Sequence, residues 1–390
     1  MAEPHLYQSF VLIFAGAAAL ATLALYGRQP LIVAYIAIGC LLGPHGLAIV
    51  PDADQLSEIA EIGIVFLLFL VGLDLQPSKL HNMVMKSLVT ALLSSAAFFA
   101  IGFSIMAGFG FSTAEAIVTG VAVTFSSTLL GIKLLPTTVL HHRHIGEIVV
   151  SLLLIQDFIA IVALLFASGY ADGMPSLLSN LGAIAVSLPL LSVGAWLTVR
   201  FAILPLLRKF DVFHEFTFLL AIGWCLGFAS LAEATGLSLA IGGFIAGVAL
   251  ATSPIALYIA ESLRPLRDFF LVLFFFTVGA ELDILLLAEV ALPTALLAAA
   301  LMAIKPGVFA TLLRWQGESS ANSWEVGYRL GQASEFSLLV SYVAVTAGLL
   351  GKEAAHVVQG ATVLTLVVSS YLVIFRYPSP IAVRAALRRD

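Results

Sequence analysis

One carboxylate lies in the middle of a long apolar segment. Asp157 belongs to the run SLLLIQDFIAIVALL and is preceded by Gln156. In a helix over 145–169, Asp157 would be about 18 Å from either end, at the 1.5 Å rise per residue of an α-helix. A charge at such a depth is costly and marks ion pathways. Burial favours the protonated carboxyl and a bound cation favours the carboxylate, so we predict that a monovalent cation and H⁺ compete at Asp157. A structural ion pair is the alternative.

A second ionisable residue within an apolar run is Lys305, in LLAAALMAIKPGVFATLL. Pro306 follows it, removes a backbone donor and is expected to kink the helix. Two roles stay open for Lys305. It could pair with Asp157 when no cation is bound, or it could bond to the carbonyl end of a broken helix and be structural.

Two short polar stretches interrupt other apolar runs, TFSST at 124–128 and GQASE at 331–335. Unwound backbone there would offer carbonyl groups and helix ends to an ion. The alternative is hydroxyl groups that bond back to their own helix. The candidate ion- and proton-binding residues are Asp157, Gln156, Thr124, Ser126, Ser127, Thr128, Gln332 and Ser334. The candidate charge-compensating residues are Lys305 and Glu335.

Other reactive residue types give weaker signals. Cys40 and Cys225 lie in apolar runs and are expected to be packing residues without a disulfide. The histidines in HHRH at 141–144 fit no metal motif. A solvated loop is favoured there over a pH-sensing patch.

These residues belong to a chain whose composition suits a bilayer. The 390 residues are 61% hydrophobic and 11% charged, whereas a soluble domain has about 25% charged residues. Apolar runs of helix length recur throughout, so we predict an all-α polytopic membrane protein with thirteen spans. The predicted spans are 5–26, 30–48, 56–75, 83–109, 113–135, 145–169, 176–207, 213–232, 236–253, 262–281, 287–313, 322–348 and 354–376.

Positive charges follow one side of this topology. With the N-terminus outside, sixteen of the eighteen Lys and Arg residues fall in inner connections, near the inner ends of spans or in the C-terminal tail. Lys352 is on the outer side and Lys305 is within a span. Cytoplasmic loops carry such an excess. The pattern predicts a multi-pass protein of the cell's inner (plasma) membrane, with the N-terminus outside and the C-terminus in the cytoplasm.

The two halves of the chain resemble each other. FLLFLVGLD at 66–74 resembles FFFTVGAELD at 274–283, with Gly72 aligned with Gly279, a shift of 207 residues. The same shift places TFSST on GQASE. The copies begin seven spans apart, so they have opposite orientations. Inverted repeats with two crossing broken helices are typical of secondary transporters.

At these motifs the sequence resembles the cation:proton antiporter-2 superfamily, closest to the membrane part of Kef-type potassium/proton antiporters. The most specific motifs are the Gln156–Asp157 pair and GQASEF at 331–336. Further motifs are LLGPHGL at 41–47, EIGIVFLLFLVGLDL at 61–75, GLSLAIGGFIAGVALATS at 236–253 and LFFFTVGAELD at 273–283.

The resemblance implies a sodium/proton antiporter-like fold and a homodimer in the lipid bilayer. It implies dimerisation and scaffold helices at 1–82 and 213–286, core ion-transport helices at 83–170 and 287–378, a linker helix at 171–212 and a cytoplasmic tail at 379–390. It also implies that Asp157 binds the cation and the proton. Kef-type proteins continue into a cytoplasmic nucleotide-binding domain, which we do not expect in this chain.

The resemblance favours an antiporter that exchanges K⁺ for H⁺ by alternating access. Electrogenic sodium exchangers commonly have a second acid where Gln156 stands, so a single carboxylate favours electroneutral exchange. An electrogenic Na⁺/H⁺ antiporter, and a channel or membrane sensor subunit, remain alternatives. We expect no enzyme activity, no cofactor besides the transported ions and no nucleic-acid partner.

Overall fold

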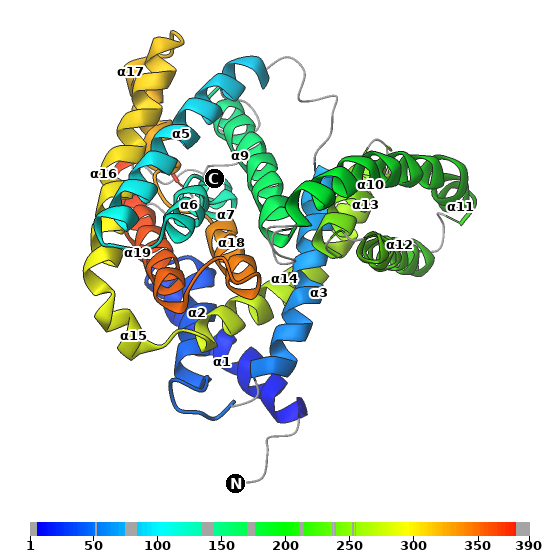
Figure 1. Ribbon diagram of the computed structural model, residues 1–390, viewed down its shortest axis with the longest axis horizontal. Coiled ribbons are helices and arrows are strands. Elements are labelled where there is room, and N and C mark those ends of the chain that lie inside the picture. The colour runs from blue at the N-terminus through cyan, green and yellow to red at the C-terminus, as the bar shows by residue number, and fades with distance from the viewer. Residues whose placement is uncertain are drawn as a thin grey trace. The chain divides into compact units, whose positions relative to one another are not determined.

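The protein is described by a computed structural model that covers residues 6–50, 53–74, 84–134, 144–169, 176–210, 214–235, 237, 239–251, 253 and 255–379. These residues are helical almost throughout (Figure 1). The all-α prediction is therefore confirmed for the described part of the chain.

The chain forms two compact units. The first comprises residues 1–50, 82–167 and 278–390, and the second comprises 51–81 and 168–277. The predicted scaffold and core domains divide the chain differently, because residues 1–50 group here with the core segments. Compactness in one conformation does not test which segments move, so the functional division stays a prediction.

Long helices dominate the first unit. Its helices are α1 (Leu6–Tyr26), α2 (Leu31–Leu42), α5 (Val84–Gly108), α6 (Thr113–Ala122), α7 (Thr128–Lys133), α9 (His144–Gly169), α15 (Ile284–Glu289), α16 (Ala291–Trp315), α17 (Ser320–Arg329), α18 (Glu335–Thr346) and α19 (Lys352–Arg376). Helix α16 packs against α5, α17 and α19, and α6 packs against α5 and α18 (Figure 1).

Among the described residues of the first unit, apolar side chains gather in two buried clusters. In one, Phe98 of α5 meets Phe309 of α16 edge to face, with ring centroids 5.3 Å apart. Leu152 of α9 and Leu330 pack in the same cluster. Burial of aromatic and aliphatic side chains fixes these helices around the central residues of α9 and α16.

The second unit contains α3 (Ala53–Asp74), α10 (Ser176–Thr198), a short π-helical segment (Val199–Ile203), α11 (Leu204–Phe210), α12 (His214–Ala234), α13 (Leu239–Ala251) and most of α14 (Ala256–Ala280). Glycines allow α3 and α13 to approach closely. A Cβ atom at Gly72 would lie 2.6 Å from the Phe244 carbonyl oxygen, and one at Gly243 would lie 2.8 Å from that of Val65. A Cβ at Gly247 would collide with the Phe69 carbonyl. Small residues at such seams are typical of membrane helix pairs.

Helices lie in each of the thirteen predicted spans. Among the described residues, seven helices are long and apolar enough to cross a membrane, and five apolar helices are shorter. The count of thirteen crossings stays a prediction.

The second predicted span ends earlier than expected. Helix α2 ends at Leu42, because the chain folds back and the N–H groups of Ile49 and Val50 donate to the Leu42 carbonyl (3.1 and 2.9 Å). This return satisfies a carbonyl that the helix end leaves free. It also places His45 in a turn outside the helix.

Candidate ion-binding site

The first polar stretch is a break between two helices. Helix α6 ends at Ala122 and α7 begins at Thr128, with Thr124, Ser126 and Ser127 buried between them. The Thr124 hydroxyl donates to the Val121 carbonyl (2.7 Å), and Ser127 Oγ accepts from the Leu130 N–H (3.1 Å). These two side chains therefore stabilise the ends of their own helices, as in the alternative stated above.

The second polar stretch is a break of the same kind. Helix α17 ends at Arg329 and α18 begins at Glu335. Ser334 caps α18, because its Oγ accepts from the Phe336 N–H at 3.1 Å. Glu335 is therefore the first residue of α18, where a carboxylate is favoured by the helix dipole, and it is 7% exposed.

Side chains of α19 hold the second break in place. Ser369 Oγ donates to Gln332 Oε1 (2.9 Å), and Thr365 Oγ1 accepts from the Ala333 N–H (3.0 Å). Sequence reasoning missed Thr365 and Ser369. Their signal is a polar stripe within an apolar span, since Thr362, Thr365 and Ser369 recur at helical spacing.

The two breaks are bonded to each other and to Lys305. Ser126 Oγ donates to the Leu330 carbonyl at 2.8 Å. Lys305 Nζ donates to the carbonyl oxygens of Val123 (3.3 Å), Phe125 (2.8 Å) and Gln332 (3.0 Å).

The ammonium of Lys305 is completely buried and lies 4.7 Å from the centre of the Phe98 ring. An ammonium group has three donors, and all three are used by carbonyls of the two breaks. Helix α16 continues through Pro306. In this conformation the geometry supports the structural role of Lys305 over pairing with Asp157.

Asp157 lies at the middle of α9 and is 5% exposed. Its carboxylate faces the first break, because Thr128 Oγ1 is 3.2 Å from Oδ1 and 3.1 Å from Oδ2. The hydroxyl has a single proton, so it can donate to either oxygen of the carboxylate. The carboxylate and Thr128 thus form an all-oxygen donor set, the kind that binds hard cations.

Gln156 is tied to the backbone of the same break. Its Oε1 accepts from the Ser126 N–H (3.2 Å), and its Nε2 lies 3.5 Å from the Thr124 carbonyl oxygen, to which it donates. Both ends of the carboxamide are used. An ionised acidic side chain could accept but not donate here. The neutral amide therefore satisfies both backbone groups and adds no charge.

The predicted residues therefore fall into two groups. In one group, the side chains of Asp157 and Thr128 contact each other, and the Gln156 carboxamide bonds to the Ser126 N–H of the first break. Thr124, Ser127, Gln332 and Ser334 shape the two breaks. Of the histidine loop only His144 is described, and its Nε2 lies 2.8 Å from Glu318 Oε1; residues 141–143 lie outside the described part.

Comparison with known proteins gives one family. Residues 10–375 match the family described as "Sodium/hydrogen exchanger, transmembrane". The chain is 32% identical over 377 residues to the glutathione-regulated potassium-efflux system protein KefC of Klebsiella pneumoniae. The aligned region covers 93% of this chain and 59% of that relative. It is 27% identical over 345 residues to the iron transporter MagA of Paramagnetospirillum magneticum. This alignment covers 88% of this chain and 79% of MagA.

Solved structures show the same fold. The sodium proton antiporter MjNhaP1 of Methanocaldococcus jannaschii superimposes with a TM-score of 0.66, at 18% identity, over 94% of each chain. At this identity the likeness shows the fold alone. The predicted resemblance to cation:proton antiporters, with Kef-type relatives among the matches, is confirmed.

Proposed function

Because this chain belongs to the sodium/hydrogen exchanger family, we propose that it exchanges a monovalent cation for H⁺ by alternating access, with Asp157 as the group that binds both ions. The observation that carries the proposal is the contact of Thr128 with both carboxylate oxygens of Asp157, at the break between α6 and α7. One carboxylate that binds either ion couples the two fluxes by competition.

Potassium is the proposed cation. Gln156 provides no second negative charge, and its two hydrogen bonds to the backbone commit it to the amide form. A weaker field at the site favours a weakly hydrated cation. The relative KefC is named for potassium efflux. The chain spans about three fifths of that relative's length.

Sodium is the alternative cation. An electrogenic cycle would need a second titrating group, and Lys305 is the candidate. Its three carbonyl contacts favour a fixed structural charge and therefore electroneutral exchange. We further propose a homodimer in the plasma membrane, with the N-terminus outside and the core segments moving against the scaffold segments.

Flux measurements on purified protein test these proposals. Proteoliposomes with an internal pH dye are given K⁺, Na⁺, Rb⁺ or Li⁺, and Fe²⁺ is included because MagA is named an iron transporter. We expect proton movement that depends on K⁺ and is unaffected by clamping the membrane potential. Cation-independent current would indicate a channel, and no flux with any cation would indicate a sensor.

A further inference from the structure

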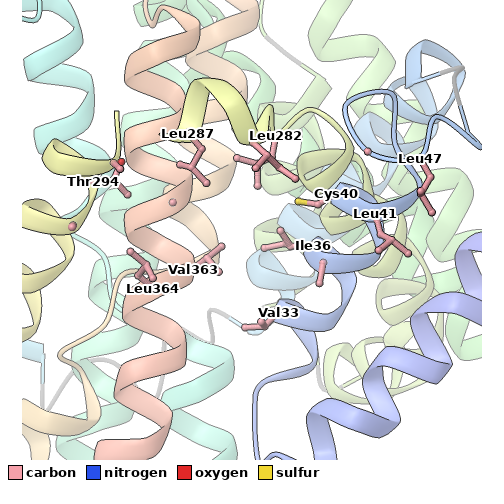
Figure 2. A pocket seen from close by; sticks show the side chains of 16 residues that line it. Val33, Ile36, Cys40, Leu41, Leu47, Leu282, Leu287, Thr294, Val363 and Leu364 are labelled. Carbon is pink, nitrogen blue, oxygen red and sulfur yellow. The ribbon is translucent and has the colours of Figure 1, made fainter. Parts of the chain in front are cut away.

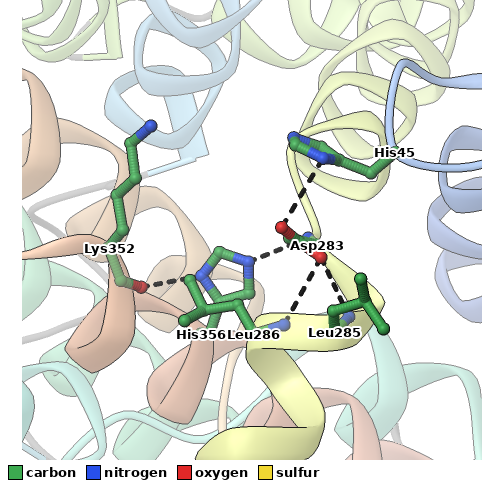
Figure 3. Close-up of polar contacts among 6 residues, drawn as sticks. All are labelled: His45, Asp283, Leu285, Leu286, Lys352 and His356. Carbon is green, nitrogen blue, oxygen red and sulfur yellow. Dashed lines mark hydrogen bonds and ion pairs between the residues drawn. The ribbon is translucent and has the colours of Figure 1, made fainter.

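A polar cluster separate from Asp157 joins three segments of the first unit around Asp283. Asp283 precedes α15, His45 lies in the turn after α2, and His356 lies in the second turn of α19 (Figure 3). The Asp283 carboxylate caps α15, accepting from the N–H groups of Leu285 (2.9 Å) and Leu286 (3.4 Å). His45 Nδ1 lies 3.7 Å from Asp283 Oδ2.

The backbone fixes the protonation state of His356. Its Nε2 lies 2.9 Å from the Asp283 backbone nitrogen, and its Nδ1 lies 2.7 Å from the Lys352 carbonyl oxygen. A backbone N–H can only donate and a carbonyl can only accept. The ring must therefore carry its proton on Nδ1 and be unprotonated on Nε2, and only the neutral ring fits both contacts.

We propose that His356 Nε2 is a second proton-binding site of this chain, and that a proton bound there releases the Asp283 backbone from α19. A proton on Nε2 would face the Asp283 N–H, so the hydrogen bond would be lost. The Asp283 carboxylate offers the charged ring another partner. The inference goes beyond the proposed function and does not require that the chain transport any ion.

The hydrogen bond adds a polar tie at the start of α15, a helix that packs against the neighbouring cluster through Leu287. None of its six residues is buried. Leu282, Ile284 and Leu287 border an apolar pocket of about 720 Å³ between α2, α16 and α19 (Figure 2). The contact between Asp283 and His356 therefore joins α19 to the connection that leads through α15 into α16.

Charged groups around His356 come from each neighbouring element. Within α19, Lys352 precedes it by one turn and Glu353 by three residues. The groups on the other elements are His45 after α2, Glu281 and Asp283 before α15, Glu289 at the end of α15, and Glu115 of α6, which accepts from the Gly351 N–H.

The two histidines respond oppositely to acid. Protonation of His45 strengthens its attraction to the Asp283 carboxylate, whereas protonation of His356 removes a hydrogen bond from the Asp283 backbone. Histidine is the side chain that changes charge between pH 5 and 8. The N–H groups of Leu285 and Leu286 hold the pKa of Asp283 below its usual range, so that carboxylate stays ionised throughout this interval.

Amide hydrogen exchange on the full chain in lipid nanodiscs tests the proposal. Peptides that contain Asp283, Leu285 and Leu286 are followed from pH 7.5 to 5.5, with α5 peptides correcting for the intrinsic pH dependence of exchange. In the wild type we expect protection to fall about tenfold on acidification, the size of one lost hydrogen bond. In His356→Gln, whose amide oxygen accepts without titrating, protection should not change with pH.

Two further variants separate the histidines. His356→Leu should exchange rapidly at every pH, because it lacks an acceptor, and His45→Gln should keep the wild-type response. A response that survives in both His356 variants, or that disappears in His45→Gln alone, would overturn the proposal. If neither His356 variant folds, a wild type whose corrected protection is constant over this pH range overturns it as well.

Discussion

The hydroxyl of Ser126 donates to the carbonyl oxygen of Leu330, across 204 positions of the chain. This contact joins the two helix breaks directly, beside Gln156 and Lys305.

Asp157→Asn should abolish cation-dependent proton flux. The melting temperature should stay within about 2 °C of the wild-type value, because the substitution keeps the shape of the side chain and should change stability little. The amide can still bond to Thr128, but it cannot exchange a proton for a cation. Flux in proteoliposomes and a melting curve provide the measurements. Asp268→Asn, at an exposed carboxylate paired with Arg267, is the control and should retain flux. Wild-type exchange in Asp157→Asn would exclude Asp157 as the binding group.

Gln156→Glu should alter cation preference or the charge moved per cycle. The substitution keeps the side-chain length, removes the donor to the Thr124 carbonyl and adds a second negative charge. Parallel K⁺ and Na⁺ titrations at a clamped membrane potential would detect both effects. Unchanged apparent affinities together with unchanged electroneutrality would show that Gln156 does not select the ion.

Lys305→Gln should lower stability by about 3 kcal/mol or more, because charge-assisted hydrogen bonds to three buried carbonyls are lost. The pH optimum of the surviving protein should not move, since a structural ammonium does not titrate during the cycle. Arg314→Gln removes an exposed cation of the same helix and should leave stability nearly unchanged. A shifted pH optimum at the wild-type melting temperature would instead indicate a charge partner of Asp157.

Thr365→Val should weaken apparent cation affinity and lower stability by about 1 kcal/mol, because the Ala333 N–H loses its acceptor inside the second break. Thr362 provides a matched control on the same helix. It is fully buried, and its hydroxyl has no hydrogen-bond partner among the described residues. Thr362→Val should therefore cost less. Equal losses in the two variants would mean that the hydrogen bond to Ala333 does not position the break.

The cap of α15 should survive mild acid. Because backbone N–H groups lower the pKa of Asp283, its stabilising effect is fully present above the ordinary carboxyl pKa of about 3.9 and is lost as the pH falls through the lower folded value. Hydrogen exchange at Leu285 should stay slow at pH 5 in His356→Gln. Loss of protection already at pH 5 in that variant would show that the cap is weaker than its geometry suggests.

The sequence was most informative where polar residues break an apolar pattern. TFSST and GQASE are interruptions within apolar runs, and both proved to be helix breaks. Asp157 lies at mid-helix, as its place in the run predicted. That these residues bind ions stays a prediction.

The partners of individual side chains could not be predicted in the same way. Lys305 had two chemically reasonable partners, and only the three-dimensional positions of Phe125 and Gln332, 180 and 27 residues away, distinguish them. The early end of α2 depends on a chain reversal whose hydrogen bonds form between backbone groups. Sequence patterns report the depth of a residue better than its contacts.

The close seam between α3 and α13 has a mechanical consequence. Gly72, Gly243 and Gly247 let the two backbones touch, and backbone contact leaves no flexible side chains to yield between them. When a single molecule is pulled out of a membrane by one end, these two segments, far apart along the chain, should resist the force as one and be extracted in a single step.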